Sequence, residues 1–313
     1  MQPKLTPGAA FGPNIDQRSN SFRGMSALRL VFDNRIHIFA MPLVVTLFWC
    51  PALRYPVPPE YLAMLFFFVA GAYIQNMISD AEEDSINYRR NLRLFSPHSP
   101  WSSLTVVVCI LISMACAITA GLQFLLYATA VNFLGYLYGA TITLKTGSRR
   151  FVIRLKSVPV LKNAYAAFFW SALLVVTPYI FSHLTVPLPV LPVIALTFIA
   201  TFIAEILWDV RDEVGDRTAE VRTIPVLLGE KRTRALLHVL NGLFAILLSA
   251  FCYFQSLPSI YWGLLTLPIF AVPFWGWFFQ ASTDKDWGSH MYLLMGCVPI
   301  VAIIAISQVM GQQ

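Results

Sequence analysis

Long apolar stretches alternate with short polar segments along most of the chain. A helix needs about 20 apolar residues to cross the hydrocarbon core of a bilayer. Nine stretches approach or exceed this length, at 36–53, 60–79, 103–121, 123–143, 159–181, 188–208, 233–254, 258–280 and 290–310. The pattern therefore predicts an all-α polytopic membrane protein with nine transmembrane helices. Residues 1–35 are predicted to be a polar N-terminal tail, and 36–310 a single transmembrane domain.

The positions of the basic residues predict the orientation of these helices. If the N-terminus is cytosolic and the chain crosses nine times, 21 of the 22 Lys and Arg fall in cytosolic segments, and only Arg54 falls outside. Cytosolic loops of membrane proteins are enriched in Lys and Arg. We therefore expect a cytosolic N-terminus, and we expect any chemistry that needs charge on the cytosolic side, because the outer loops are almost uncharged.

The composition agrees with a membrane protein: 57% of the residues are hydrophobic, 12% are charged, and the mean hydropathy is +0.65. A soluble domain carries about 25% charged residues, so an ordinary soluble enzyme and a disordered chain are excluded. The pI of about 9.1 would suit nucleic acid, but the basic residues lie in short loops between spans, which favours membrane topology and no nucleic-acid partner. The polar start of the chain indicates no cleavable leader, which fits a bacterial inner membrane or the endoplasmic reticulum equally.

Two series of acidic and amide side chains follow the second and sixth apolar stretches. They are Asn76, Asp80 and Asp84 in the first series, and Glu205, Asp209, Asp212 and Asp216 in the second. Spacings of three and four residues place each series on one helix face. Stacked carboxylates repel one another, and oxygen ligands of this kind suit Mg²⁺, especially where a phosphate group completes the coordination. A solvated acidic loop would explain one such series, but two on the same side favour a metal site.

The two series lie four spans apart, which suggests a pseudo-duplicated four-helix unit that places two helix ends across a central cavity. A diphosphate held there would also need basic side chains to stabilise its charge as it leaves. The candidates for this contact are Arg35, Arg90, Arg93, Lys145, Lys162 and Arg222. Lys162 is the strongest of them, because it begins an apolar helix, whereas topology alone explains a basic residue in a loop.

These motifs resemble those of the UbiA superfamily of intramembrane prenyltransferases, over roughly residues 30 to 310. The first series resembles the family's NDxxDxxxD motif, with Met77 at the usual second position, and Asp209–Asp216 resembles its DxxDxxGD motif. The segments 221–229 and 158–163 are similar to the family's "gvxTlPvllG" and "iPllKN" patterns. A compact YxxxK after the fourth helix is replaced by the looser pair Tyr138 and Lys145.

The resemblance implies a fold with nine helices and a mechanism in which two Mg²⁺ ions bridge the diphosphate of an isoprenoid substrate. It implies metal ligands at Asn76, Asp80, Asp84, Asp209, Asp212 and Asp216. It further implies that Lys162 acts with Asp80, Asp84, Asp209 and Asp212 in catalysis. The prenyl chain would lie in an apolar cavity open to membrane lipid, where aromatic faces stabilise an allylic carbocation. Candidates for that role are Trp49, Tyr73, Tyr136, Tyr138, Phe168, Trp170 and Trp208.

Three functions remain open at this point. In a prenyltransferase an acceptor, unidentified from the sequence, captures the carbocation. In a membrane terpene cyclase of the same family, a double bond of the prenyl chain attacks it instead, and the divergent first motif and the missing YxxxK favour keeping this alternative. A transporter is the third possibility, but its polar residues should lie near the bilayer midplane, whereas here they gather at one face.

Overall fold

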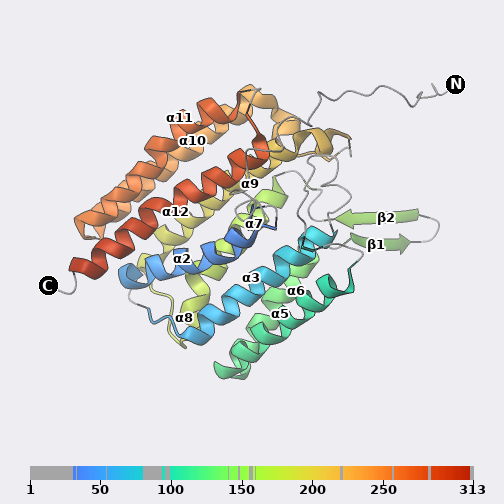
Figure 1. Ribbon diagram of the computed structural model, residues 1–313, viewed down its shortest axis with the longest axis horizontal. Helices are drawn as coiled ribbons and strands as arrows, with labels where there is room; N and C mark the ends of the chain where they lie inside the picture. The colour runs from blue at the N-terminus through green and yellow to red at the C-terminus, as the bar shows by residue number, and fades with distance from the viewer. Residues whose placement is uncertain are drawn as a thin grey trace, which may run out of the picture.

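Long helices lie side by side in a bundle that leans in one direction across the molecule (Figure 1). The computed structural model describes residues 31–32, 34–53, 55–79, 94–95, 99–139, 141–146, 149–154, 158, 160–218, 221–255, 257–280 and 283–310. The helices and strands are α2 (Ile36–Leu53), α3 (Pro59–Ser79), α5 (Pro100–Thr119), α6 (Leu122–Gly139), β1 (Thr141–Thr146), β2 (Arg149–Arg154), α7 (Leu161–Ser171), η3 (Ala172–Val176), α8 (Thr177–Phe181), η4 (Leu188–Val190), α9 (Leu191–Thr218), α10 (Ile224–Phe254), η5 (Ser259–Leu265), α11 (Thr266–Phe278) and α12 (Lys285–Met310).

The helical, multi-pass architecture predicted from hydropathy is confirmed. Within the described ranges, eight helical segments are long and apolar enough to span a membrane, and a shorter ninth apolar helix covers Leu122–Gly135. Each of the nine predicted stretches falls on one of these segments. The sixth is longer than predicted, because α9 continues from the apolar stretch through the second acidic series to Thr218. The predicted tail, 1–35, lies mostly outside the described residues.

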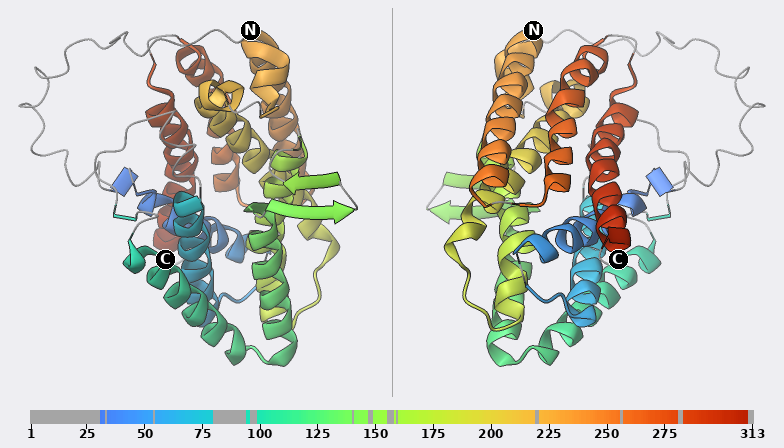
Figure 2. Two further views of the ribbon diagram at one scale, coloured as in Figure 1. Left: turned by 90° about the vertical axis from the view of Figure 1, so that its right-hand side faces the viewer. Right: turned by 90° about the vertical axis from the view of Figure 1, so that its left-hand side faces the viewer.

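A β-hairpin adds to the all-α prediction. β1 pairs with β2 in antiparallel register, from Thr141 opposite Arg154 to Thr146 opposite Arg149. The predicted fourth span ran to residue 143, whereas α6 ends at Gly139. Threonine and isoleucine at 141–143 are β-branched and favour strands, and a hydropathy window does not separate them from helix. The hairpin projects from the bundle, as Figures 1 and 2 show.

Close backbone approach holds α3 against α5. A Cβ atom added to Gly71 would lie 3.1 Å from the Cβ of Cys109, so only a glycine fits there without displacing the neighbour. Small residues at helix interfaces are the usual means of close packing in membranes. In the other half of the bundle α9 packs against both α7 and α10, and α12 packs against α2 and α9.

A π-helical turn, η3, interrupts the segment that runs from α7 to α8. A π-helical turn changes which backbone carbonyl groups accept hydrogen bonds from within the helix. The hydroxyl of the fully buried Tyr61 on α3 donates a hydrogen bond of 2.9 Å to the carbonyl of Leu173 in this turn. The turn is therefore tied to α3, and its residue Leu174 reaches the cavity described below.

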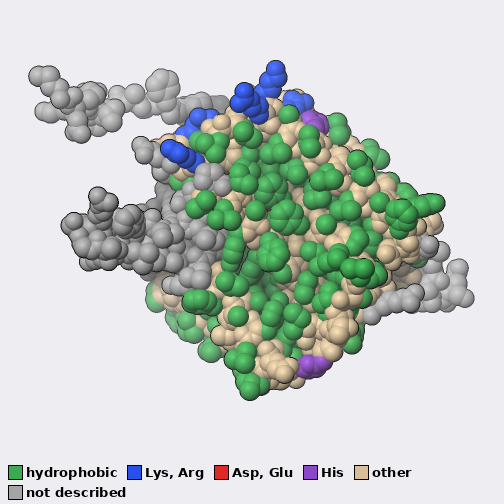
Figure 3. Space-filling model, turned by 180° about the vertical axis from the view of Figure 1, so that it is seen from behind, with side chains coloured by type: hydrophobic (Ala, Val, Ile, Leu, Met, Phe, Trp, Pro, Cys, Tyr) green, Lys and Arg blue, Asp and Glu red, His purple; other side chains and the backbone are tan. Residues whose placement is uncertain are grey.

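The outer surface of the bundle is largely apolar. Large hydrophobic side chains such as Trp101, Leu188 and Phe254 are exposed, which is expected where lipid replaces water as solvent. Figure 3 shows one such face, on which hydrophobic side chains cover most of the area and Lys and Arg gather toward the upper end.

Candidate functional site

A cavity of about 820 Å³ lies among α2, α9, α10, α11, α12 and η5. Its walls are mostly apolar. Phe270, Val298 and Ile306 line it and are strongly exposed. The cavity is therefore open to the surroundings of the bundle beside α11 and α12, where an apolar chain could enter from lipid.

The aromatic candidates divide according to whether they reach this cavity. Trp49, Tyr73, Trp170 and Trp208 line it, and the rings of Tyr73 and Trp170 are stacked with centroids 6.1 Å apart. Phe168 does not belong to this group, because it is 65% exposed on another face of α7 and is not among the cavity residues. The side chains of Tyr136 and Tyr138 lie outside the described part of the structure.

Asp209 is fixed by the first turn of α7. Val160, with a positive φ of 63°, turns the chain into α7, and the next two helical positions after Leu161 face α9. Lys162 Nζ donates to Asp209 Oδ1 at 2.6 Å, and Asn163 Nδ2 donates to Asp209 Oδ2 at 2.8 Å. Asp209 is only 1% exposed, so the ammonium group offsets a charge that would be costly to bury alone.

Asp212 is held by its chain neighbour Arg211, which the sequence pattern only counts among the 21 basic residues of the cytosolic segments. The Nε and Nη2 atoms of Arg211 donate to the two Asp212 carboxylate oxygens at 2.8 and 2.7 Å. This bidentate arrangement fixes the orientation of both groups. The Arg211 side chain is 4% exposed, and its guanidinium carbon lies 4.3 Å from the centroid of the Trp208 ring.

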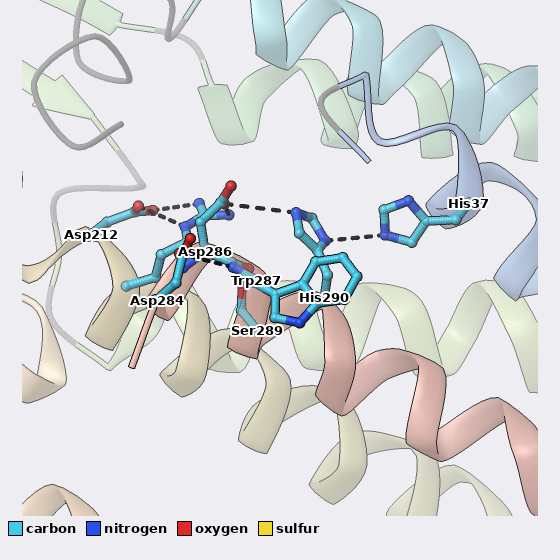
Figure 4. Close-up of polar contacts among 8 residues, drawn as sticks. His37, Asp212, Asp284, Asp286, Trp287, Ser289 and His290 are labelled. Atoms are coloured by element: carbon cyan, nitrogen blue, oxygen red, sulfur yellow. Dashed lines mark hydrogen bonds and ion pairs between the residues drawn. The ribbon is translucent and has the colours of Figure 1, made fainter. Parts of the chain in front are cut away.

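A chain of polar contacts continues from Arg211 to α12 and α2 (Figure 4). Arg211 Nη1 donates to Asp286 Oδ1 at 3.5 Å, and His290 Nε2 lies 3.7 Å from the same oxygen. The other ring nitrogen of His290, Nδ1, is 3.1 Å from Nε2 of His37 on α2. Asp284 accepts hydrogen bonds from the backbone N–H groups of residues 286 and 287, in the first turn of α12. Three helices thus meet around the second acidic series.

Arg35 joins the same region from the start of α2. It is 5% exposed, and its guanidinium carbon lies 5.8 Å from the centroid of the Trp208 ring. Its φ of 55° is unusual for a residue other than glycine, and such strained backbone concentrates at functional sites. Together with Lys162 and Arg211 it gathers positive charge near one end of the cavity, which suits an anion.

Comparison with known proteins identifies the architecture. The model of the UbiA prenyltransferase family matches residues 41–297. This chain belongs to the UbiA prenyltransferase family. The solved structures that share its fold include a UbiA homologue from Archaeoglobus fulgidus bound to GPP and Mg²⁺ (16% identity, TM-score 0.57, 88% of this chain and 99% of that one). They also include an apo UbiA homologue from Aeropyrum pernix K1 (16% identity, TM-score 0.62, 87% of this chain and 98% of that one).

A curated relative gives a more local match. Digeranylgeranylglyceryl phosphate synthase of Methanoregula boonei is 34% identical over 113 residues, which is 36% of this chain. The match spans only 38% of that relative's length. Family membership and the eight apolar spans make this UbiA-family chain an integral, multi-pass membrane protein.

Of the first UbiA-type motif, the structure describes only the first part, which contains Asn76. Asn76 lies near the end of α3, where its carbonyl accepts a hydrogen bond of 3.1 Å from the Ser79 hydroxyl. Asp80, Asp84, Arg90 and Arg93 lie outside the described residues, as does the side chain of Lys145 on β1. Arg222 is exposed in the segment that leads into α10.

The donor set of the second motif fits a hard divalent cation. Asp209, Asp212 and Asp216 share one face of α9, and Oδ2 of Asp216 is buried with no hydrogen-bond partner in the described part of the chain. A carboxylate offers about four lone-pair positions, so Asp209 and Asp212 keep capacity beyond their present contacts. The described residues contain no cluster of three or more His, Cys, Asp or Glu that would hold a metal alone. A metal ion at this motif would therefore need further ligands, for example from the first motif or from a diphosphate.

Sequence reasoning missed Asn163, Arg211, Asp286, His290 and His37. Asn163 could have been found, because it belongs to the "LKN" segment that was already singled out for Lys162. The histidines and Asp286 carry no spacing signal, because they come from α2 and α12, which lie 253 residues apart at the His37–His290 contact.

Proposed function

We propose that this UbiA-family chain is a Mg²⁺-dependent intramembrane prenyltransferase. It ionises an isoprenoid diphosphate and transfers the prenyl group to an acceptor. The observation that carries the proposal is the continuity of α9: Glu205 and Trp208 line the apolar cavity, and Asp209 and Asp212, with their basic partners, follow on the same helix. A polar site for a diphosphate and an apolar site for its chain therefore adjoin. The homologue bound to GPP and Mg²⁺ supports the same substrate class.

The chain's own residues would divide the work as follows. Asp209, Asp212 and Asp216, with Asn76, Asp80 and Asp84, would hold two Mg²⁺ ions, which supply positive charge to the diphosphate oxygens. Lys162 and Arg35 bind the diphosphate and stabilise the negative charge that grows as it departs. Trp208, Tyr73 and Trp170 line the cavity in which the allylic cation would form, and aromatic rings stabilise such a cation. The apolar cavity walls keep water from capturing it.

The site is proposed to face the cytosol, together with the N-terminus. The positive-inside distribution of Lys and Arg supports this orientation. The second motif, Lys162 and the hairpin then share the cytosolic end, and the cavity extends from there into the membrane.

The proposal predicts that Asp212→Asn lowers Mg²⁺-dependent diphosphate release from farnesyl or geranylgeranyl diphosphate by roughly 100-fold or more. The change keeps the shape of the side chain but removes a ligand charge. Glu213→Gln is the matched control, because Glu213 is the next residue and pairs with the exposed Arg217. EDTA should abolish the release and Mg²⁺ restore it. Near-normal turnover of Asp212→Asn would contradict the proposal.

The same assay separates transfer from cyclisation. Incubation with the prenyl diphosphate and Mg²⁺, with no acceptor added, should give no cyclic hydrocarbon if the chain is a transferase. A cyclic product released together with diphosphate would instead identify a terpene cyclase. Substrate-dependent diphosphate release by the protein in detergent would dismiss the third possibility, a transporter.

A further inference from the structure

Glu205 has no part in the proposed chemistry, although it lies at its edge. It is one helical turn before Asp209 on α9, and it lines the cavity. Among the described residues that line the cavity, it is the only charged side chain; the rest are apolar, aromatic or neutral polar. Tyr73 and Trp208, two of the aromatic candidates, border the same space.

A carboxyl group in such a place needs a physical reason. An ionisable side chain inside a membrane-spanning segment is costly and usually marks a substrate or proton path. The charged groups that act on Glu205 are Lys162, Asp209 and Arg211, and the latter two follow it on α9. Glu205 lines the cavity, and no described Lys, Arg or His is among the other residues that line it.

We infer that Glu205 binds the hydroxyl group of an uncharged, apolar acceptor and takes its proton during transfer. This inference rests on the proposed prenyltransferase function. The bond between the prenyl C1 and the diphosphate oxygen breaks, and its electron pair leaves with the diphosphate. A lone pair of the acceptor oxygen forms the new C–O bond, and the hydroxyl proton passes to the Glu205 carboxylate. The products are a prenyl ether, diphosphate and protonated Glu205.

The cavity lining selects against charged acceptors, since Lys162 and Arg35 at the end of the cavity are already assigned to the diphosphate. The described lining offers no Lys, Arg or His to bind a carboxylate or phosphate, and the Glu205 carboxylate repels either one. A hydroxyl group, in contrast, donates a hydrogen bond to a carboxylate. The volume of about 820 Å³ lies near the upper end of the range of about 300–1,000 Å³ for ligand pockets, which favours two apolar molecules together. Exposed apolar residues of α11 and α12 line the open side of the cavity, where both can enter.

The experiment uses the full chain, Mg²⁺, geranylgeranyl diphosphate and three probes: the neutral 1-hexadecanol and 4-nonylphenol, and hexadecanoic acid as the charged counterpart of the alcohol. Mass spectrometry measures the prenyl ether or ester, and a coupled assay measures diphosphate. We expect ether from at least one neutral probe and little ester. Glu205→Gln should lower ether formation by roughly 100-fold or more, as expected for loss of a general base. The concentration of geranylgeranyl diphosphate that half-saturates the Glu205→Gln variant should differ less than about threefold from that of the wild type, because Glu205 does not bind the diphosphate.

Two further variants keep the result interpretable. Glu60→Gln makes the same chemical change on an exposed residue in the first turn of α3 and should leave ether formation unchanged. Glu205→Asp keeps the carboxylate and should retain more activity than Glu205→Gln, which a purely structural role would not produce.

The possible failures are distinct. No Mg²⁺-dependent diphosphate release by the wild type under any condition would reject the proposed function itself. Release without ether from either neutral probe, or ester formed as readily as ether, would overturn the acceptor class. Equal ether formation by the wild type and Glu205→Gln would overturn the role of Glu205. If the wild type makes a hydrocarbon and Glu205→Gln does not, Glu205 takes a proton from the carbocation and not from an acceptor, which would also overturn the inference.

Discussion

At the scale of single residues, Asp209 and Asp212 are each held by a cationic side chain. Lys162 and Arg211 approach them at 2.6 and 2.7 Å. These contacts orient the carboxylates before any ligand arrives, and pre-oriented groups lose less entropy on binding. The same cations stand beside the proposed diphosphate site, so one ammonium or guanidinium group can serve both the folded state and the substrate.

Lys162→Met should therefore destabilise the protein. It leaves the 1%-exposed Asp209 without its counter-charge, and breaking a buried pair in this way costs about 3 kcal/mol. Mg²⁺ should recover part of the loss, because it would neutralise the same carboxylate. Thermal denaturation in detergent, with and without Mg²⁺, measures both effects. Lys231→Met, at an exposed position on α10, is the control and should be nearly neutral; an equal loss in both variants would contradict the explanation.

Asp286→Asn tests the contact chain beyond the carboxylates. Asp286 contacts Arg211, which orients Asp212. Mutation of a residue that orients a metal ligand typically lowers metal affinity by about 10- to 100-fold. We expect the Mg²⁺ concentration for half-maximal diphosphate release to rise in that range, with a smaller change in the maximal rate. Glu230→Gln, which is exposed on α10, should leave both values unchanged. A fall in maximal rate alone would argue against a positioning role.

At the scale of elements, α9 joins two environments in one helix. Its apolar part was predicted from hydropathy and its acidic part from side-chain spacing, and the structure shows that they are continuous through Thr218. The neighbouring α10 begins with Ile224 and Pro225 and is broken at Gly229, whose φ is 72°. The Thr-Ile-Pro-Val-Leu-Leu-Gly pattern thus has a conformational basis: proline suits a helix start, and glycine suits a positive φ.

The contact between α3 and α5 gives a prediction at this scale. Gly71→Val places new atoms within 3.1 Å of Cys109 Cβ, so the two helices must separate. Overpacking of this kind costs about 1–3 kcal/mol. Gly242→Val is the matched control on α10, because a Cβ there meets nothing within 4 Å. Thermal denaturation in detergent should show a lower midpoint for Gly71→Val than for Gly242→Val. The reverse order would mean that the α3–α5 contact is loose.

At the scale of the whole molecule, the bundle separates charge from apolar surface. The basic partners of the second motif gather near one end of the cavity, and Figure 3 shows Lys and Arg near one end of an apolar face. We therefore expect the membrane to surround the apolar surface of the bundle. The proposed site then lies at one of the two boundaries between membrane and water.

Arg54 tests the orientation of the molecule. It is the one basic residue predicted on the far side of the membrane, so Arg54→Ala should leave diphosphate release within about twofold of the wild type. Arg35→Ala, in contrast, removes a buried guanidinium group near Trp208 and should lower release by roughly 100-fold. A loss of similar size in Arg54→Ala would show that the predicted number of spans or their direction is wrong.

The sequence alone determined the spans and the second motif. Both are local properties: the length of an apolar run decides whether a helix can cross a bilayer, and spacings of three and four residues decide that Asp209, Asp212 and Asp216 share a face. The β1–β2 hairpin was not predicted, because hydropathy does not distinguish an apolar strand from an apolar helix over a few residues.

Only the tertiary structure decided which distant side chains meet. The partners of Asp209 come from α7, and the contact chain through Asp286, His290 and His37 comes from α12 and α2. Only the packed helices show that Trp170 faces the cavity while Phe168 faces away, or that Glu205 is the charged group in that wall. Such contacts depend on how helices rotate and cross, and those angles are set by the fit of all the surrounding side chains together.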